Sequence, residues 1–206
     1  MRHPFAHPAL AALLAAAGLL GATRRATAQM PSQCTAVAAN LVANCGFETG
    51  AFGGWTASGD TSNTGIDAYS THSGGYGAYF ANRAPQTLAQ TLATVAGTRY
   101  TVSFWLLSED NPIPGTAFFR ASMGGAPLVD LEGQAPLAYT EYSFTTVATG
   151  AATELQFAIE NAPSFYQLDD VSVVPAAVTT TPEPATTALV AAGLLALGAA
   201  ARRRRV

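Results

Sequence analysis

Two adjacent acids near the end of the chain, Asp169 and Asp170, are well suited by type and position to bind a cation. Residues 167–174 are predicted to form a β-strand, and if Val171 and Val173 face the core, the two-residue period puts Asp169 on the same inward side. A bare carboxylate there is costly, so we expect a cation to neutralise it. Calcium fits this chemistry because it takes about six to eight oxygen ligands in irregular geometry. Asp170 is the alternative ligand if the strand register differs by one residue.

A second candidate chemistry is the stacking of sugar rings on an exposed aromatic side chain, with short polar groups completing the hydrogen bonds. Trp105 is the best candidate, because it alternates with an apolar set that should fill the core. That set comprises Tyr100, Val102, Phe104 and Leu106. The alternative is that a layer of loops covers Trp105. Trp55, just after a Gly-Gly turn, is expected in the core.

Three tyrosines are further candidates for a sugar platform. They are Tyr139, Tyr166 and Tyr69, with Glu141 or Gln156 as polar partners. Together with Trp105 they define the predicted carbohydrate site.

The sequence offers little that would support catalysis. His72 is the one histidine that follows the N-terminal segment, and it lies in a glycine-rich turn. No nucleophile elbow, metal-type histidine pair or phosphate loop is present. The acid pairs Glu109/Asp110 and Asp130/Glu132 could serve a glycosidase or lyase, but adjacent acids in loops are usually solvated. We therefore expect a non-catalytic protein.

Short extended runs broken by Gly, Pro, Asn and Asp must position these groups. Residues 99–108 form the clearest predicted strand, and residues 155–160 and a run containing Tyr142 and Phe144 show the same alternation. Further strands are expected at residues 76–81, 86–93, 116–122, 128–131 and 167–174. No helical period competes between residues 40 and 175. The pattern predicts an all-β antiparallel sandwich of the jelly-roll type.

Several short motifs then resemble the galactose-binding-like jelly rolls, a group that includes xylan- and glucan-binding carbohydrate modules. They are Asn40-Leu41-Val42, Gly46-Phe47-Glu48, Trp55, His72-Ser73-Gly74, residues 97–105 and residues 168–173. The resemblance spans residues 40–174, with Cys45 standing where the group usually has glycine.

This resemblance implies a structural calcium ion. The implied ligands are Glu48, Asp169 and the backbone around Ser73 and Gly74. The alternative is that Glu48 is a turn acceptor and Asp169 an exposed acid at a strand end.

The C-terminal tail carries three features in a fixed order. Pro182-Glu183-Pro184 precedes an apolar run over residues 185–201, and Arg202, Arg203, Arg204 and Arg205 follow. Pro184 suits the first position of a helix, and the run would give a single transmembrane helix of about 25 Å. The arginines are expected on the cytoplasmic side, which leaves the preceding domain outside the inner membrane.

These three features together resemble the PEP-CTERM sorting signal of Gram-negative bacteria that produce exopolysaccharide. The resemblance implies that an exosortase cuts near the Pro-Glu-Pro box and releases the domain. The alternative is a permanent tail anchor without processing.

The N-terminus agrees with export. Arg2, an apolar run over residues 9–22 and Ala26-Thr27-Ala28 are typical of a secretory signal peptide over residues 1–28, to be removed by signal peptidase. Cleavage after Ala22 is the alternative. A jelly-roll domain over residues 29–176, a linker over 177–184 and the sorting tail over 185–206 complete the expected organisation.

Charge limits the partners of the mature domain. The whole chain carries −3, but seven of its ten arginines lie in the two terminal segments and lysine is absent. Three arginines then oppose twelve acids over residues 29–180, a net charge of −9. Such a surface repels nucleic acid and anionic lipid. It suits a neutral polysaccharide, a cation or an acidic polymer bridged by divalent ions.

The two cysteines lie close together in the mature chain. Because an exported protein meets an oxidising compartment, Cys34 and Cys45 are predicted to form a disulfide that pins the N-terminal arm to the first strand. Closing so short a loop contributes about 3 kcal/mol. Zinc is not expected, since neither the spacing nor a second Cys/His pair supports it.

The sequence therefore predicts an exported, non-catalytic protein of the cell surface or extracellular matrix. It is expected to associate with exopolysaccharide or biofilm and to bind carbohydrate. A structural or protein-contact domain without a sugar site is the alternative, and a small polysaccharide-acting enzyme is less favoured.

Overall fold

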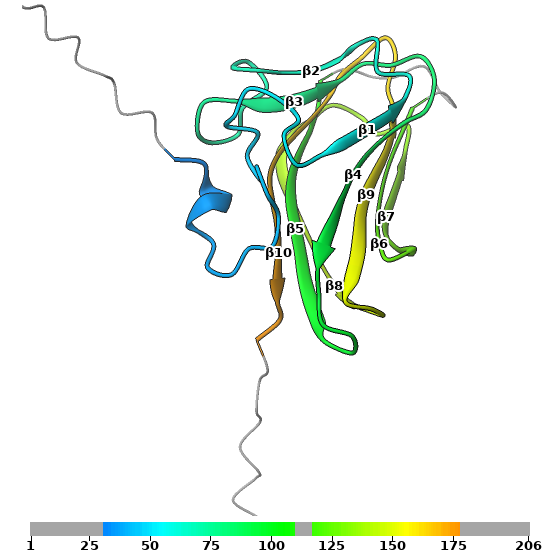
Figure 1. Ribbon diagram of the computed structural model, residues 1–206. Helices are drawn as coiled ribbons and strands as arrows, with labels where there is room; N and C mark the ends of the chain where they lie inside the picture. The colour runs from blue at the N-terminus through cyan, green and yellow to red at the C-terminus, as the bar shows by residue number, and fades with distance from the viewer. Residues whose placement is uncertain (1–30, 110–116, 178–206) are drawn as a thin grey trace, which may run out of the picture.

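The computed structural model describes residues 31–109 and 117–177, which form two antiparallel five-stranded sheets packed face to face (Figure 1). The β4/β9 sheet contains, in spatial order, β1 (Thr56–Gly59), β4 (Gln86–Ala93), β9 (Ala152–Glu160), β6 (Phe118–Met123) and β7 (Ala126–Glu132). The β5/β10 sheet contains β2 (Thr64–Asp67), β3 (Gly77–Phe80), β10 (Tyr166–Pro175), β5 (Arg99–Ser108) and β8 (Leu137–Val147). A short 3₁₀ turn, η1 (Gln33–Ala36), lies beside β10. The predicted all-β sandwich is confirmed.

Alternating side chains from the two sheets fill the core between them. On β5 the predicted inward set is buried, whereas Ser103, Trp105 and Leu107 on the opposite face are half-buried. Phe104 lies at the centre, with its ring centroid 5.6 Å from that of Phe119 and 5.2 Å from that of Phe157. Aromatic rings at these separations add to the stabilisation that burial itself provides.

Trp55 belongs to this core, as predicted. It is 7% exposed, and its ring stacks on Phe47 with centroids 5.8 Å apart. The ring of Phe157 in β9 lies 6.0 Å from that of Trp55, so Trp55 connects the segment before β1 to the β4/β9 sheet.

The strands that show clear alternation in the sequence are found where they were predicted. Strands β4 and β5 have the expected bounds, β3 and β6 differ from the expected ranges by one or two residues at an end, and Thr116 lies outside the described residues. Strands β1 and β2 were not predicted. Each has four residues, and none of them is buried, so they carry no apolar period.

A β-bulge in β10 overturns the expected orientation of Asp169. Asp169 pairs with Trp105 and Ser172 pairs with Ser103, and the register shifts between them because Asp170 adopts a left-handed φ of 49°. Val173 stays in the core, but Asp169 lies on the outer face of the sheet with Trp105. The strict two-residue period was the wrong assumption, since a bulge inserts one residue and resets the alternation.

The predictions for both ends of the chain fall outside the described residues. These concern the signal peptide over 1–28, the Pro-Glu-Pro box at 182–184, and the helix and arginines over 185–206. Within residues 31–109 and 117–177, no helix is long and apolar enough to cross a membrane.

Replacing Phe104 by alanine should destabilise the protein by about 3–5 kcal/mol, because it leaves a cavity between the two sheets. Chemical denaturation measures this change. Val147→Ala is the control, since Val147 is 46% exposed and its loss should change the free energy of unfolding by less than about 0.5 kcal/mol. Equal effects of the two substitutions would contradict the assignment of the core.

Candidate functional site

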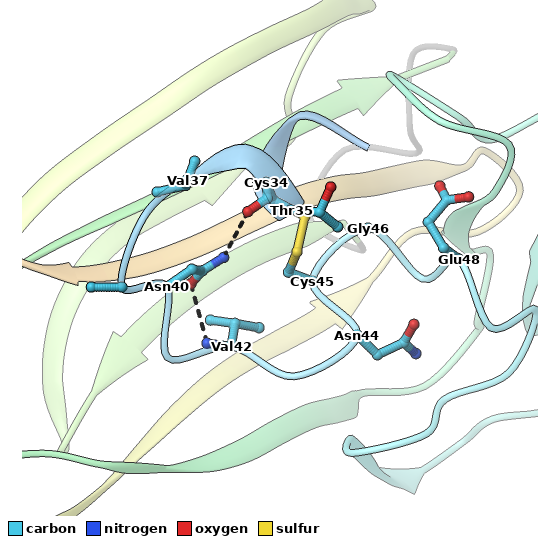
Figure 2. A pocket seen from close by; sticks show the side chains of 10 residues that line it. Cys34, Thr35, Val37, Asn40, Val42, Asn44, Cys45, Gly46 and Glu48 are labelled. Carbon is cyan, nitrogen blue, oxygen red and sulfur yellow. Dashed lines mark hydrogen bonds between the residues drawn. A yellow bond between two sulfur atoms is a disulfide. The ribbon is translucent and has the colours of Figure 1, made fainter. Parts of the chain in front are cut away.

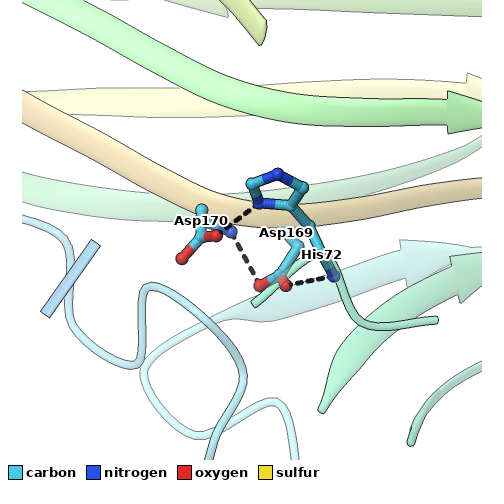
Figure 3. Close-up of side chains that lie close together, drawn as sticks. All are labelled: His72, Asp169 and Asp170. Atoms are coloured by element: carbon cyan, nitrogen blue, oxygen red, sulfur yellow. Dashed lines mark hydrogen bonds and ion pairs between the residues drawn. The ribbon is translucent and has the colours of Figure 1, made fainter. Parts of the chain in front are cut away.

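Two buried carboxylates at the bulge of β10 organise the outer face of the β5/β10 sheet. Asp169 is 0% exposed and Asp170 is 4% exposed. Figure 3 shows both side chains directed toward His72, which comes from the loop between β2 and β3. Ligand atoms of these three residues lie within 4.8 Å of one another.

Asp169 holds this loop through backbone donors. Its Oδ2 accepts hydrogen bonds from the N–H groups of His72 (2.8 Å) and Ser73 (3.1 Å), and its Oδ1 accepts the N–H of Asp170 (2.7 Å). Burial and the neighbouring charge of Asp170 raise the pKa of Asp169 to about 7, although these hydrogen bonds partly oppose the rise. Asp169 therefore attaches the loop to β10.

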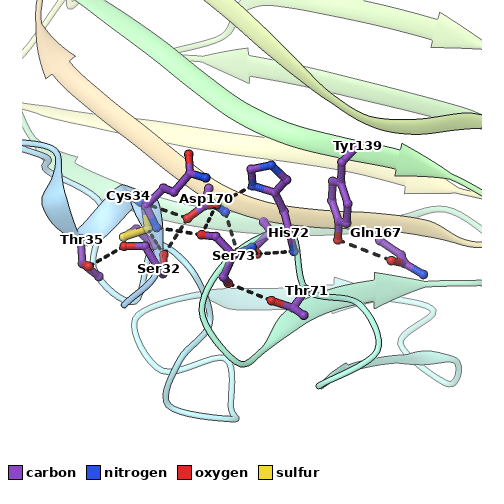
Figure 4. A network of polar contacts seen from close by, with 12 residues as sticks. Ser32, Cys34, Thr35, Thr71, His72, Ser73, Tyr139, Gln167 and Asp170 are labelled. Carbon is purple, nitrogen blue, oxygen red and sulfur yellow. Dashed lines mark hydrogen bonds and ion pairs between the residues drawn. A yellow bond between two sulfur atoms is a disulfide. The ribbon is translucent and has the colours of Figure 1, made fainter. Parts of the chain in front are cut away.

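Asp170 binds both the same loop and the N-terminal arm, residues 31–36. Its Oδ1 accepts the Ser32 hydroxyl (2.6 Å) and the N–H of Cys34 (3.0 Å). Its Oδ2 meets the Ser73 hydroxyl (2.5 Å) and His72 Nδ1 (2.7 Å). Figure 4 shows this network. Burial alone would raise the pKa of Asp170, but the hydrogen bonds from Ser32, Ser73 and His72 outweigh it and lower the pKa.

The predicted disulfide between Cys34 and Cys45 is confirmed, and it fixes the arm over this network. Figure 2 shows the bond beside Asn40, whose amide nitrogen donates to the carbonyl oxygen of Cys34 (3.3 Å). The arm packs closely on Gly46, where a Cβ atom would collide with the Ser32 side chain. Since residues 31–55 contain no β-strand, the disulfide ties the arm to a turn rather than to the first strand.

Glu48 serves as an acceptor for the same loop. Its two carboxylate oxygens lie 3.0 and 3.1 Å from the N–H nitrogen of Gly75. Gly74 adopts a φ of 77° against this carboxylate, and a Cβ atom there would collide with Glu48. The loop thus depends on Glu48 as well as on the two aspartates.

The protein donors around these acids argue against the predicted calcium ion, which stays a prediction to be tested with a chelator. Calcium needs carboxylate and carbonyl oxygens directed at one point. The oxygens of Asp169 and Asp170 accept N–H and O–H groups, and the oxygens of Glu48 lie next to the N–H of Gly75. Protein donors offset the cost of burying the two charges.

Trp105 does not present its ring as a sugar platform. The ring of His72 stacks on it with centroids 3.8 Å apart and an interplanar angle of 14°. The ring centroid of Tyr139 lies 5.2 Å from that of His72, and the Tyr139 hydroxyl donates a hydrogen bond to the carbonyl oxygen of Ser70. Burial, and then the charges of Asp169 and Asp170, raise the pKa of Tyr139. The alternative that a loop covers Trp105 is the one that the structure favours.

A cavity of about 490 Å³ opens on the outer face of the same sheet, next to Tyr139. Residues from the loops and from β2, β3 and β10 line it: Ser62, Asn63, Asp67, Tyr69, Ser70, Tyr79, Glu109, Phe165 and Gln167. Three are aromatic, and two of these are exposed, Tyr69 by 92% and Phe165 by 36%. Figure 4 shows Gln167 beside Tyr139, whose hydroxyl lies 3.4 Å from Gln167 Oε1. The lining combines exposed aromatic rings with converging polar groups, which is the arrangement that sugar binding requires.

The predicted carbohydrate residues are thus divided between several places. Tyr69 lines the cavity and Tyr139 contacts its wall, whereas Tyr166 is 0% exposed and packs on Phe119 in the core. Glu141 pairs with Trp105 across β8 and β5, but Gln156 belongs to the other sheet and cannot assist Trp105. The structure does not support a sugar-binding role for Tyr166.

The sequence interpretation did not identify Tyr79, Phe165 and Gln167 as site residues. Tyr79 and Gln167 are paired across β3 and β10 on the outer face, which is the face opposite Leu168 and Phe80. Alternation within residues 76–81 and 167–174 could have indicated this pair. Phe165 lies just before β10 and carries no such signal.

A smaller groove of about 210 Å³ lies on the outer face of the β4/β9 sheet. Its lining is Thr56, Ser58, Thr87, Ala89, Gln90, Thr91, Glu154 and Gln156. None of these residues is aromatic, so the groove offers hydrogen bonds without a stacking surface.

Comparison with protein families gives two matches. A family model described as a carbohydrate binding domain matches residues 39–164, and one described as the PEP-CTERM protein-sorting motif matches residues 180–205. No curated protein matches the chain. Both resemblances seen in the sequence, to carbohydrate-binding jelly rolls and to a PEP-CTERM signal, are confirmed.

Solved structures share the fold. TmCBM61, in complex with β-1,4-galactotriose, superposes with a TM-score of 0.56 at 23% identity, covering 66% of this chain and 99% of that one. The CBM22-1–GH10 modules of the Clostridium thermocellum xylanase Xyn10B, in complex with xylohexaose, give a TM-score of 0.51 at 19% identity over 71% of this chain and 30% of that one. A tailspike protein of bacteriophage CBA120 gives 0.51 at 14% identity, covering 66% of this chain and 21% of that one. At these identities the likeness is one of fold.

Replacing Cys34 and Cys45 together by serine should lower the free energy of unfolding by about 3 kcal/mol, because the unfolded chain loses its cross-link and the arm is no longer fixed over Asp170. Denaturant titration of the two proteins measures the difference. Added calcium or a chelator is the control on the unmodified protein, and neither should move its melting temperature. A chelator that destabilised the protein as much as the serine substitutions would contradict our description of the acidic cluster.

Proposed function

This chain belongs to the carbohydrate binding domain family whose model matches residues 39–164, and we propose that it is an exported surface protein that binds a polysaccharide in the cavity beside Tyr69. The combination of exposed rings and polar groups in that cavity carries the proposal. Tyr69, Tyr79 and Phe165 supply apolar faces for the C–H edges of sugar rings. Gln167, Asn63 and Ser62 supply donors and acceptors for hydroxyl groups.

The family and the cavity together favour a binding role over a catalytic one. Xylohexaose and galactotriose, the ligands in two structures of similar fold, are neutral oligosaccharides. Neutral β-linked oligosaccharides are therefore suitable first probes for this chain. The groove on the β4/β9 sheet is a second candidate, because Glu154 and Gln156 offer a row of polar groups along β9.

The C-terminal motif supports a route to the cell surface. Its match over residues 180–205 includes the Pro-Glu-Pro box and the four arginines. In this proposal the signal peptide directs export from a Gram-negative cell and the C-terminal helix holds the chain in the inner membrane. An exosortase then releases the domain to the surface, where it associates with exopolysaccharide in a biofilm matrix. The protein serves there as a non-catalytic binding module.

Replacing Tyr69 by alanine should weaken oligosaccharide binding by about five- to tenfold, since an exposed stacking surface contributes about 1 kcal/mol. Isothermal titration calorimetry on a ligand selected from a glycan array measures the loss, and Phe165→Ala should behave in the same way. Tyr76→Ala is the matched control, because Tyr76 is also exposed but does not line the cavity. If substitution of Gln156 abolished oligosaccharide binding and Tyr69→Ala had no effect on it, the binding site would lie on the other sheet. If no glycan on the array bound the correctly folded protein, a structural or protein-contact role would be favoured.

Material recovered from the native host should have lost both ends of the chain. Intact mass spectrometry should find a species that begins near Gln29 and ends near the Pro-Glu-Pro box at 182–184. Deletion of the host's exosortase should leave the C-terminal helix attached. A surface species that still contains Arg202–Arg205 in the presence of the exosortase would instead indicate a permanent tail anchor.

A further inference from the structure

The polar lining of the cavity beside Tyr69 is acidic. Asp67 and Glu109 lie in its wall, and no arginine or histidine is among the residues that line it. The three arginines within the described part of the chain, Arg83, Arg99 and Arg120, all lie elsewhere. A ligand in the cavity therefore meets carboxylates and no opposing positive charge from these side chains.

Hydrogen bonds hold both carboxylates in place. Asp67 Oδ1 accepts the N–H groups of Tyr69 (3.0 Å) and Ser70 (2.8 Å), which are themselves in the lining. Glu109 Oε1 accepts Gln167 Nε2 across the cavity wall. Acids fixed in this way lose little side-chain entropy when they meet a charged ligand.

The negative potential extends beyond these two acids. Burial, followed by the charges of Asp169, Asp170, Asp67 and Glu109, raises the pKa of Tyr139. The Tyr139 hydroxyl touches the cavity wall at Ser70 and Gln167. At mildly acidic pH the potential at this wall therefore comes from Asp67, Glu109 and Asp170, because a pKa of about 7 leaves Asp169 largely protonated. Asp170 is buried, so water and salt screen its charge weakly.

We propose that the cavity selects sugar polymers that carry protonated amino groups, as in deacetylated amino-sugar chains, and rejects polymers of uronic acids. The inference rests on the proposed carbohydrate function of the same cavity. An ammonium group on the sugar would pair with Glu109 and Asp67, while the exposed rings of Tyr69 and Phe165 would attract it through their faces. A uronate in the same position would meet like charges.

The test compares three short oligosaccharides of equal length, built from glucosamine, N-acetylglucosamine and galacturonate. Calorimetric titration of the full domain at mildly acidic pH and low salt should give about fivefold tighter binding of the glucosamine oligomer than of its acetylated counterpart. Higher salt should reduce this ratio, and galacturonate should not bind.

Glu109→Gln should remove most of the preference for the amine, because glutamine carries no charge but keeps an oxygen that can accept Gln167 Nε2. Glu154→Gln removes an equal charge from the outer face of the other sheet and should keep the preference. Equal affinities for the amine and its acetylated form, or equal effects of the two substitutions, would overturn the inference and leave the proposed function intact. Failure of every oligomer to bind the folded domain would instead refute the proposed function.

Discussion

The buried carboxylates of Asp169 and Asp170 are the constraint on which the outer face of this sandwich depends. A bulge in β10 brings both acids under the loop of residues 68–76, and each must be satisfied by donors because burial makes a bare charge costly. Backbone N–H groups of the loop, the Ser73 hydroxyl and the N-terminal arm provide those donors. The disulfide between Cys34 and Cys45 then keeps the arm in position. These interactions fix the shape of a loop that contains little apolar side chain to hold it.

This anchored loop connects the stability of the fold to the proposed binding site. Tyr69 and Ser70 lie in it, a few residues before the atoms that Asp169 holds, and they form one wall of the cavity. The ring of His72 covers that of Trp105 next to the cavity. The exposed aromatic rings that line the cavity are therefore those of Tyr69 and Phe165. The core between the sheets fixes β3 and β10, which supply Tyr79 and Gln167 on the opposite wall. The jelly roll thus carries the proposed binding surface on its outer face, while apolar side chains fill the core between the sheets.

Local alternation predicted the parts of the fold that are long and apolar, and it failed where single residues break the pattern. The inward set of β5 and the burial of Trp55 follow directly from the sequence. The bulge at Asp170 does not, because nothing in a run of Asp, Val and Ser marks the residue that adopts a positive φ. Trp105 satisfied every local criterion for a sugar platform, yet His72, 33 positions earlier, covers it. Tyr166 and Phe165 are adjacent aromatics, and which of them is exposed depends on the strand that begins between them.

The most direct test of this account is a crystal structure of the domain with a bound oligosaccharide. We expect sugar density in the cavity, with a ring stacked on Tyr69 or Phe165 and hydroxyl groups hydrogen-bonded to Gln167. We also expect an acidic cluster in which Ser32, Cys34 and His72 still contact Asp170. Sugar density over Thr87 and Gln156 with the cavity vacant, or a metal ion among the carboxylates in place of these donors, would contradict it.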